Sequence, residues 1–454
     1  MPETAMMRVL LVSYAFPPVG GAGVQRIAKL AKYLPRAGIE PWVLTVQNPS
    51  VPLHDPSLLA DLPETLRVIR AHTLEPGYAL KAEAWRAGAN ASRSLRARLT
   101  RRAASGARAL LVPDPQVLWL PAAARALYRE RNAVQAILVS GPPFSSHLLG
   151  LFGRLAPNVG VVLDYRDEWT TLRHSYEMAG GALFDGVLER ACLRSAHRIT
   201  TATGAFREKL LERFPFLHPD HVVTIENGFD PEDLPRVDPP RMEQRMRLTY
   251  AGTVFRLTSA QGFLAALRLL HQRSPALARL LEVRFIGRIV ETEQHYFDGS
   301  ESLGVTRLGY LPHRDALRQL AGSHVALCLL DACPGAERIY PAKIFELLGL
   351  GRPVLALCPE GVLARLVREE NLGTVVDPRD APRIAEALQR LLAEYSSGRL
   401  PERSTPRDPE RFDRRRQAQR FAEVLADAAS AALAGPRDHG AIAASPLTSA
   451  RSAS

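Results

Sequence analysis

The chain has 454 residues, which is too long for one hydrophobic core and predicts two or three domains. A hydrophobic share of 46% beside 23% charged residues is ordinary for a globular protein and excludes general disorder. The formal net charge of +11 predicts an anionic partner and leaves nucleic acid, an acidic membrane surface and a phosphorylated substrate open.

The cysteines and the N-terminus favour a reducing cytoplasm. No C-x-x-C spacing occurs, so we expect neither a zinc site nor a disulfide framework. The four cysteines are Cys192, Cys328, Cys333 and Cys358. The apolar run from Val9 to Val12 is too short for a signal peptide, so we expect the protein to stay in the cytoplasm.

Short β-branched runs alternate with longer helical patterns in two similar halves, which predicts two parallel sheets covered by helices. The strands expected in the first half are 8–13, 41–46, 136–140, 160–165, 198–203 and 222–225. Those expected in the second half are 247–252, 281–287, 305–310, 325–330, 353–358 and 373–377. The fold class is therefore α/β, with two doubly wound, Rossmann-like domains.

The domain boundaries follow from changes in composition. A stretch rich in proline and charge without apolar runs, DPEDLPRVDPPRMEQ, separates the two halves and is typical of a linker. We expect a first domain at 1–230, a linker at 231–246, a second domain at 247–400, and a connector with a terminal helix at 401–435. The Ser/Ala-rich tail, 436–454, is expected to be disordered.

A glycine-rich loop follows the first predicted strand. Gly20, Gly21 and Gly23 precede an amphipathic helix whose free amides can face a phosphate or a sugar. The dinucleotide fingerprint is incomplete, because GAGVQR lacks the third small residue and no acidic residue closes the second strand. A dinucleotide-dependent protein remains an alternative, although this pattern argues against it.

Polar residues also follow the middle strands of the first half. His147 comes after a double proline, and Arg166 with Asp167 directly follows strand 160–165. Such a histidine commonly packs or caps, and such an Arg–Asp pair can be structural. Because parallel strands end at one edge of a sheet, we take Asp167, Arg166 and His147 as candidate catalytic residues beside a polar acceptor.

In the second half, basic residues follow two strands. Arg256 and Arg288 could each meet a diphosphate through bidentate hydrogen bonds. For Arg288 we prefer the interpretation of a solvated loop charge.

The stretch AERIYPAKIFELLGLGRPVLA places Lys343 and Glu346 on one face of a helix that Pro341 is expected to open. One interpretation is a solvated ion pair, which stabilises by about 0.2–0.5 kcal/mol. The other is that Lys343 and free helix amides meet a diphosphate while Glu346 accepts hydrogen bonds from two ribose hydroxyls. Charged hydrogen bonds contribute about 1.5–3 kcal/mol each, so we favour the second interpretation.

Together, these stretches resemble the retaining, nucleotide-sugar-dependent glycosyltransferases of the two-domain GT-B type, specifically the family 4 group. The resemblance runs from RVLLVSYAFPPVGGAGVQR through TIENGFD and LGYLPH to the terminal helix. It implies a cleft in which the second domain holds the nucleotide sugar and the first holds the acceptor, with the terminal helix returning to the first domain. It also implies that Glu346 binds the ribose and that Gly20 and Gly21 lie near the donor phosphates.

The implied function is transfer of a sugar to a glycan or lipid-linked acceptor in surface polysaccharide or glycoconjugate biosynthesis. The implied donor site comprises Gly20, Gly21, Arg256, Glu337, Lys343 and Glu346. No D-x-D sequence occurs, so we expect no metal and no other cofactor.

Three positions differ from the family pattern, and one of them is Arg166, which stands beside Asp167 where a His is often found after the middle strand of the first domain. The residue seven before Glu346 is Arg338 rather than the first acid of a glutamate pair, with Glu337 one step away, and Gln261 stands where a lysine is usual. A non-catalytic sugar-nucleotide-binding protein therefore remains an alternative. A nucleic-acid-binding protein is disfavoured, because the basic residues form no recognisable module.

The segment from Ala84 to Pro113 carries no acidic residue, which fits either a solvated basic helix or a helix lying on an anionic membrane. We favour the second interpretation and expect attachment at the inner face of the plasma membrane. Its arginines are Arg86, Arg93, Arg96, Arg98, Arg101, Arg102 and Arg108. Each basic residue near such a surface adds about 1 kcal/mol. We expect the protein to sediment with anionic but not neutral vesicles at low salt. A variant with Arg96, Arg98, Arg101 and Arg102 changed to Gln should stay in solution, and equal binding by that variant would exclude this segment as the anchor.

Overall fold

The computed structural model describes residues 6–51, 53–79, 81, 111–154, 156–172, 182–235 and 245–435. The arginine-rich segment lies outside the described residues up to residue 110, as do the middle of the predicted linker and the tail from residue 436. Within the described ranges, every helix is too short or too polar to span a membrane.

The first domain is built on seven parallel strands in the order β3-β2-β1-β4-β5-β6-β7. The strands are β1 (Met7–Val12), β2 (Ile39–Val46), β3 (Arg67–Ala71), β4 (Ala136–Gly141), β5 (Gly160–Tyr165), β6 (Arg198–Thr201) and β7 (Val222–Thr224). Its helices are α1 (Ala22–Tyr33), α4 (Leu120–Glu130), α5 (Ala182–Ser195) and α6 (Gly204–Arg213).

The second domain is built on six parallel strands in the order β10-β9-β8-β11-β12-β13. The strands are β8 (Met246–Ala251), β9 (Leu281–Ile286), β10 (Val305–Gly309), β11 (Val325–Leu329), β12 (Val354–Leu357) and β13 (Gly373–Val376). Its helices are α7 (Gln261–Arg273), α8 (Pro275–Ala278), α9 (Glu291–Gln294), α10 (His313–Ala321), α11 (Lys343–Leu350), α12 (Val362–Glu369) and α13 (Ala381–Ser396).

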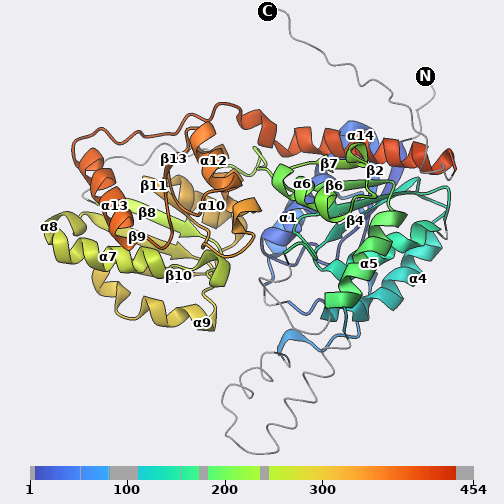
Figure 1. Cartoon of the computed structure of the whole chain (residues 1–454), viewed down its shortest axis with the longest axis horizontal. Coiled ribbons are helices and arrows are strands. Elements are labelled where there is room, and N and C mark those ends of the chain that lie inside the picture. The colour runs from blue at the N-terminus through green and yellow to red at the C-terminus, as the bar shows by residue number, and fades with distance from the viewer. Residues whose placement is uncertain are drawn as a thin grey trace, which may run out of the picture.

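Each sheet has a hydrophobic core on both faces, because successive side chains of a strand point in opposite directions. In β1, Leu10 and Val12 pack with α4, α5 and α6, whereas Val9 and Leu11 pack with α1. Burial on both faces explains why the central strands are nearly continuous apolar runs. The predicted fold class of two doubly wound parallel-sheet domains is confirmed (Figure 1).

The strand β3 was not predicted from the sequence. It lies at the edge of the sheet and is largely solvent-accessible, so Arg67 and Arg70 interrupt its apolar pattern. The guanidinium of Arg67 lies 3.9 Å from the centroid of the Trp42 ring on β2. A cation–π contact thus helps to hold β3 against β2. Because the residue that makes this contact is an arginine, a search for apolar runs does not detect the strand.

The last helix, α14 (Arg414–Leu433), packs on the first domain, as the red helix in Figure 1 shows. Phe421, Leu425 and Ala428 are buried in the same core as α1. The contact is so close that a Cβ on Gly160 would lie 2.5 Å from the carbonyl carbon of Ala428. The first domain is therefore completed by the end of the chain.

A buried ion pair connects α1 to β5. The guanidinium of Arg26 donates to Asp164 from Nη2 to Oδ1 at 2.8 Å and from Nε to Oδ2 at 3.1 Å. Ser140 and Thr200 each donate a further hydrogen bond of 2.7 Å to the carboxylate. Burial alone would raise the pKa of Asp164, but the charge of Arg26 and these hydrogen bonds hold it below its usual value.

The same guanidinium also binds the chain where it leaves the first domain. It donates to the carbonyl oxygens of Ile225 at 2.8 Å and Glu226 at 3.0 Å, and it stacks 4.8 Å from the centroid of the Phe421 ring on α14. One side chain therefore joins α1, β5, the end of β7 and α14.

We expect Asp164→Asn to lower the free energy of unfolding by about 3–5 kcal/mol, because it leaves the charge of Arg26 buried without a counterion. The matched control is Glu40→Gln, which removes an ion pair with Arg8 whose side chains are 37% and 42% exposed. That control should cost less than about 1 kcal/mol. Urea denaturation measures the free energy of unfolding of both variants. Equal losses would show that the buried ion pair stabilises the protein no more than the exposed one does.

Candidate functional site

A cavity of about 570 Å³ lies between the two domains, within the size range of small-molecule sites. The lining residues of the first domain include Gly21, Gly23, Arg166, Asp167 and Thr203, and those of the second include Gly252, Gly287, Tyr310, Lys343 and Glu346. Most of them directly follow strands. This is where doubly wound domains bind ligands.

Lys343 and Glu346 lie on this wall and also pair with each other. Their side chains are separated by 2.6 Å between Nζ and Oε2. The other carboxylate oxygen, Oε1, lies 3.9 Å from Nε2 of His313 and makes no closer contact in the described chain. The ion pair of the first interpretation is thus present on the cavity wall, and the second interpretation stays a prediction.

The helix α11 begins later than the sequence predicts. Pro341 was expected at the first helical position, but the helix starts at Lys343 with Ala342 as its N-cap residue. Pro341 and Ala342 instead form part of the cavity wall. The first turn of α11, with its free amides, still adjoins the cavity.

The glycine loop brings the two domains close together. Gly21, the N-cap residue of α1, has a φ of 99° that favours glycine, and it lines the cavity. A Cβ on Gly20 would lie 2.7 Å from the hydroxyl oxygen of Tyr310 in the second domain. The backbone conformation therefore favours glycine at position 21, whereas a side chain at position 20 would require the Tyr310 hydroxyl to move.

Arg166 and Asp167 have different surroundings. The guanidinium of Arg166 donates to the carbonyl oxygens of Gly141, Gly23 and Pro142, so it holds the loops around the cavity in place. Asp167 lines the cavity and makes no hydrogen bond within the described residues. Asp167 is exposed to solvent, but the surrounding protein partly desolvates it and raises its pKa, while the charge of Arg166 opposes this shift. Asp167 is the carboxylate free to meet a substrate.

The structure does not bring His147 to the cavity wall. Its ring is fully buried and packs 4.3 Å from the Tyr165 ring, in space that exists because position 141 is glycine. Burial lowers the pKa of His147 to about 4, which leaves the imidazole neutral at pH 7. These surroundings fit the packing role that the sequence left open.

Three predicted donor residues also lie outside the cavity lining, namely Gly20, Arg256 and Glu337. Arg256 is exposed on a short 3₁₀ turn, and Glu337 pairs with Arg338 with its side chain 45% exposed. Arg288, which the sequence assigned to solvent, lines the cavity and makes no ion pair in the described part of the chain. Arg288 is thus better placed than Arg256 to meet an anionic group.

Arg338 lines the cavity and links the two domains. It donates to Glu168 of the first domain, from Nε to Oε1 at 2.6 Å and from Nη2 to Oε2 at 3.1 Å. Thr203 of the first domain donates to the carbonyl oxygen of Arg338 at 3.0 Å. The residue that differs from the family pattern therefore forms a bidentate contact across the cleft.

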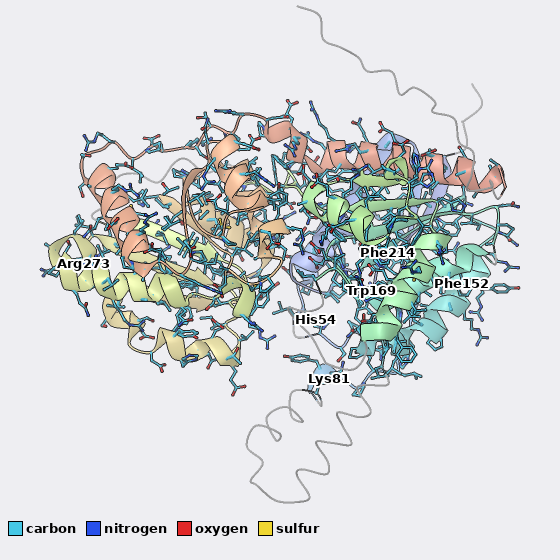
Figure 2. All side chains as sticks on the ribbon, viewed as in Figure 1. His54, Lys81, Phe152, Trp169, Phe214 and Arg273 are labelled. Carbon is cyan, nitrogen blue, oxygen red and sulfur yellow. The ribbon has the colours of Figure 1, made fainter. Side chains whose placement is uncertain are left out.

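A second contact across the cleft involves Asp55, which follows His54, the residue labelled in Figure 2 on the side of the first domain that faces the second. Its carboxylate accepts hydrogen bonds from the backbone amide of His313 at 3.0 Å and from the Tyr310 hydroxyl at 3.3 Å. His313 is the first residue of α10, so a side chain of one domain caps a helix of the other.

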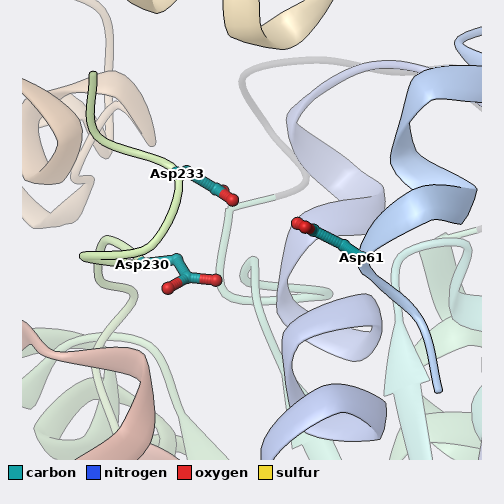
Figure 3. Close-up of side chains that lie close together, drawn as sticks. All are labelled: Asp61, Asp230 and Asp233. Carbon is teal, nitrogen blue, oxygen red and sulfur yellow. The ribbon is translucent and has the colours of Figure 1, made fainter. Parts of the chain in front are cut away.

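Three carboxylates, those of Asp61, Asp230 and Asp233, point toward one another beside the cavity (Figure 3). Oxygen ligands so arranged could hold a cation. The ammonium of Lys29 takes that position, because it lies 2.8 Å from Asp230 and 2.7 Å from Asp233 and also pairs with Asp61. A metal ion would have to displace Lys29, so we interpret this cluster as structural.

Comparison with known proteins agrees with the observed fold. Residues 19–233, somewhat less than half of the chain, match the model of Glycosyltransferase Family 4. No curated protein matches the sequence.

Solved structures match over almost the whole chain. Sucrose-phosphate synthase from Thermosynechococcus elongatus is 18% identical with a TM-score of 0.62, and the match covers 94% of this chain and 100% of that one. Anabaena HepE in complex with UDP and glucose is 14% identical with a TM-score of 0.62, covering 92% and 99%. WaaG, a glycosyltransferase involved in lipopolysaccharide biosynthesis, is 14% identical with a TM-score of 0.52, covering 93% and 98%.

These likenesses define the class of fold. The chain has the two-domain GT-B architecture of glycosyltransferases, as the sequence predicts. The particular similarity of the first domain is to Glycosyltransferase Family 4.

A buried glutamate supports the loop that carries Asp167 and Glu168. Glu189 on α5 accepts hydrogen bonds from the backbone amide of Thr170 at 3.2 Å and from its hydroxyl. The other carboxylate oxygen of Glu189 has no partner in the described chain. Burial raises the pKa of Glu189 to about 7, although the hydrogen bonds from Thr170 and the charge of Arg213 oppose the shift.

We expect the proton on Glu189 to contribute a loss of stability as the pH rises from 5 to 8, while buried His147, whose pKa is lowered, contributes in the opposite direction. The folded state holds a proton on Glu189 that the unfolded state releases, so unfolding becomes easier by about 2–3 kcal/mol across this window. Glu189→Gln should remove this dependence. Glu212→Gln, whose side chain is 70% exposed, should keep it. Urea denaturation at several pH values measures the slopes, and parallel profiles for the wild type and Glu189→Gln would contradict the assignment.

Proposed function

We propose that this protein is a glycosyltransferase, of the hexosyltransferase type, that uses a nucleoside diphosphate sugar as donor. Its acceptor is a glycan or a lipid-linked sugar, the anomeric configuration is retained, and the product belongs to a surface polysaccharide or glycoconjugate. The observation that carries the proposal is the position of Lys343 and Glu346 on the cavity wall at the first turn of α11. HepE, which shares this fold, was solved with UDP and glucose, and this supports a nucleotide sugar as donor.

Charge builds on the departing diphosphate when the sugar leaves, and stabilising that charge is the main catalytic task. Lys343, Arg288 and the amides of the first turn of α11 supply positive potential in the second domain. These groups perform the task without a metal ion. Glu346 orients the donor by accepting hydrogen bonds from the ribose hydroxyls with the oxygen that Lys343 does not occupy.

The acceptor lies against the first domain. Asp167 is the free carboxylate on that side and binds a hydroxyl of the acceptor, while Arg166 positions the surrounding loops. We further propose that the protein works in the cytoplasm at the inner face of the plasma membrane, which would place this side near a membrane-borne acceptor.

A second candidate is a sugar-nucleotide-binding protein without transferase activity. The specific observation in its favour is Arg338, which pairs with Glu168 where the family pattern has an acid that contacts the donor sugar. Release of the nucleoside diphosphate from a donor sugar, with or without acceptor, would exclude this alternative.

We expect Glu346→Ala to weaken binding of the donor nucleotide by about tenfold or more and to leave the protein folded, because it removes charged hydrogen bonds from a cavity wall. A thermal-shift screen of nucleoside diphosphate sugars first identifies the donor. Calorimetry then compares the wild type, Glu346→Ala and the control Glu360→Ala, whose side chain is 74% exposed. Unchanged affinity in Glu346→Ala would leave the Lys343–Glu346 contact as an ion pair only.

We expect Asp167→Asn to lower the transfer rate by about ten- to a hundredfold while nucleotide affinity stays within about threefold of wild type. The reason is that Asp167 belongs to the first domain's wall of the cavity, where we propose that the acceptor binds. Asp220→Asn, a change at an 86% exposed side chain of the same domain, is the control. Equal losses of rate and affinity, or unfolding, would mean that Asp167 has a structural role.

A further inference from the structure

Arg414 lies where the chain crosses between the domains for the second time. Its backbone amide donates to the carbonyl oxygen of Phe229 at 3.0 Å, and the amide of Phe229 donates to that of Phe412 at 2.9 Å. The segment that leaves the first domain thus pairs with the segment that returns to it. Arg414 is also the first residue of α14, and its side chain lines the cavity.

The guanidinium of Arg414 is buried without a direct counterion. The residue is 8% exposed, and its side chain makes one hydrogen bond, from Nη1 to the neutral amide oxygen of Gln417 at 3.1 Å. No carboxylate in the described chain lies within ion-pair distance of it. The other buried cations near the cavity differ in this respect, since Arg26 pairs with Asp164 and Lys29 with three aspartates.

The surroundings leave the positive charge of Arg414 incompletely balanced. Burial lowers the pKa of Arg414 to about 9, and the positive charge of Arg26 lowers it further. The carboxylates of Glu346, Asp230 and Asp164 raise the pKa, but they offset only part of this decrease. The guanidinium stays charged at pH 7. A buried cation without a partner is destabilising, so an anion entering the cavity would gain both a bidentate donor and a favourable potential.

We propose that Arg414 binds an anionic oxygen of the donor's diphosphate from the side of the terminal helix. This assignment rests on the proposed function. Glu346, the proposed ribose ligand, is among the groups whose charge acts on Arg414, and the diphosphate is the charged group attached to that ribose. In this arrangement both domains contact the donor. Arg414 adds a contact from the start of α14, which belongs to neither sheet.

The test compares Arg414→Gln with Arg416→Gln, which makes the same change two residues later on α14 at a 58% exposed side chain paired with Glu410. Calorimetry measures binding of UDP and GDP and of the nucleosides uridine and guanosine. For the diphosphate that the wild type binds, Arg414→Gln should weaken affinity by about tenfold or more, with affinity for the matching nucleoside changed less than twofold. Arg416→Gln should bind as the wild type does.

Stability separates a ligand-binding role from a structural one. Without ligand, Arg414→Gln should melt at the same temperature as the wild type or higher, because it removes a buried, poorly balanced charge. Should Arg414→Gln fail to fold, Arg414→Lys keeps the charge but loses the planar donor pair, and it should weaken diphosphate binding by a smaller factor than tenfold.

Three results would overturn the assignment. One is unchanged diphosphate affinity in Arg414→Gln, or in Arg414→Lys if only that variant folds. Another is an equal loss for diphosphate and nucleoside together with a lower melting temperature, which would mark Arg414 as structural. A wild type that binds none of the nucleoside diphosphate sugars of the thermal-shift screen would refute the proposed function itself, and the assignment with it.

Discussion

The buried contact between Arg26 and Asp164 is the constraint on which the first domain and its wall of the cavity depend. An ionised carboxylate in a core is tolerated only when its oxygens are satisfied, and here one guanidinium and two hydroxyls do this. The same guanidinium binds the carbonyl oxygens where the chain leaves the domain. Since Arg26 follows the glycine loop and Asp164 precedes Arg166 by two residues, the pair also fixes both loops that border the cavity.

Charges on the cavity walls are mostly neutralised by groups of the protein itself. Lys29 is enclosed by aspartates, Arg338 pairs with Glu168, and Lys343 pairs with Glu346. This neutralisation allows the two domains to approach each other although many charged groups meet there. Among the cations of this wall in the described chain, Arg288 and Arg166 form no ion pair, and the side chain of Arg414 has only an amide partner. Positive potential is therefore concentrated where an anionic ligand can enter.

The sequence predicted the architecture well because strands buried on both faces are long apolar runs, and it missed β3 because that edge strand carries arginines. It also placed Glu346, Lys343 and Asp167 at strand or helix ends that do face the cavity. It could not indicate Asp55 or Arg414. Both belong to loops or helix starts without apolar periodicity, and each reaches the site only through contacts with residues more than 180 positions away. The sequence also could not tell which of Arg256 and Arg288 lines the cavity, because both are basic residues that follow a strand.

The return of α14 to the first domain makes that domain discontinuous in sequence, whereas the second domain is continuous. During synthesis, the ribosome completes the first sheet at β7 but adds α14 only roughly 200 residues later. At about 5–20 residues per second, the faces of β4 and β5 that α14 covers remain open for roughly 10–40 seconds. The second domain can therefore complete its core before the first domain does. This is the reverse of the usual order, in which the N-terminal domain folds first during synthesis. A nascent chain of this architecture exposes an apolar sheet surface that chaperones are suited to cover.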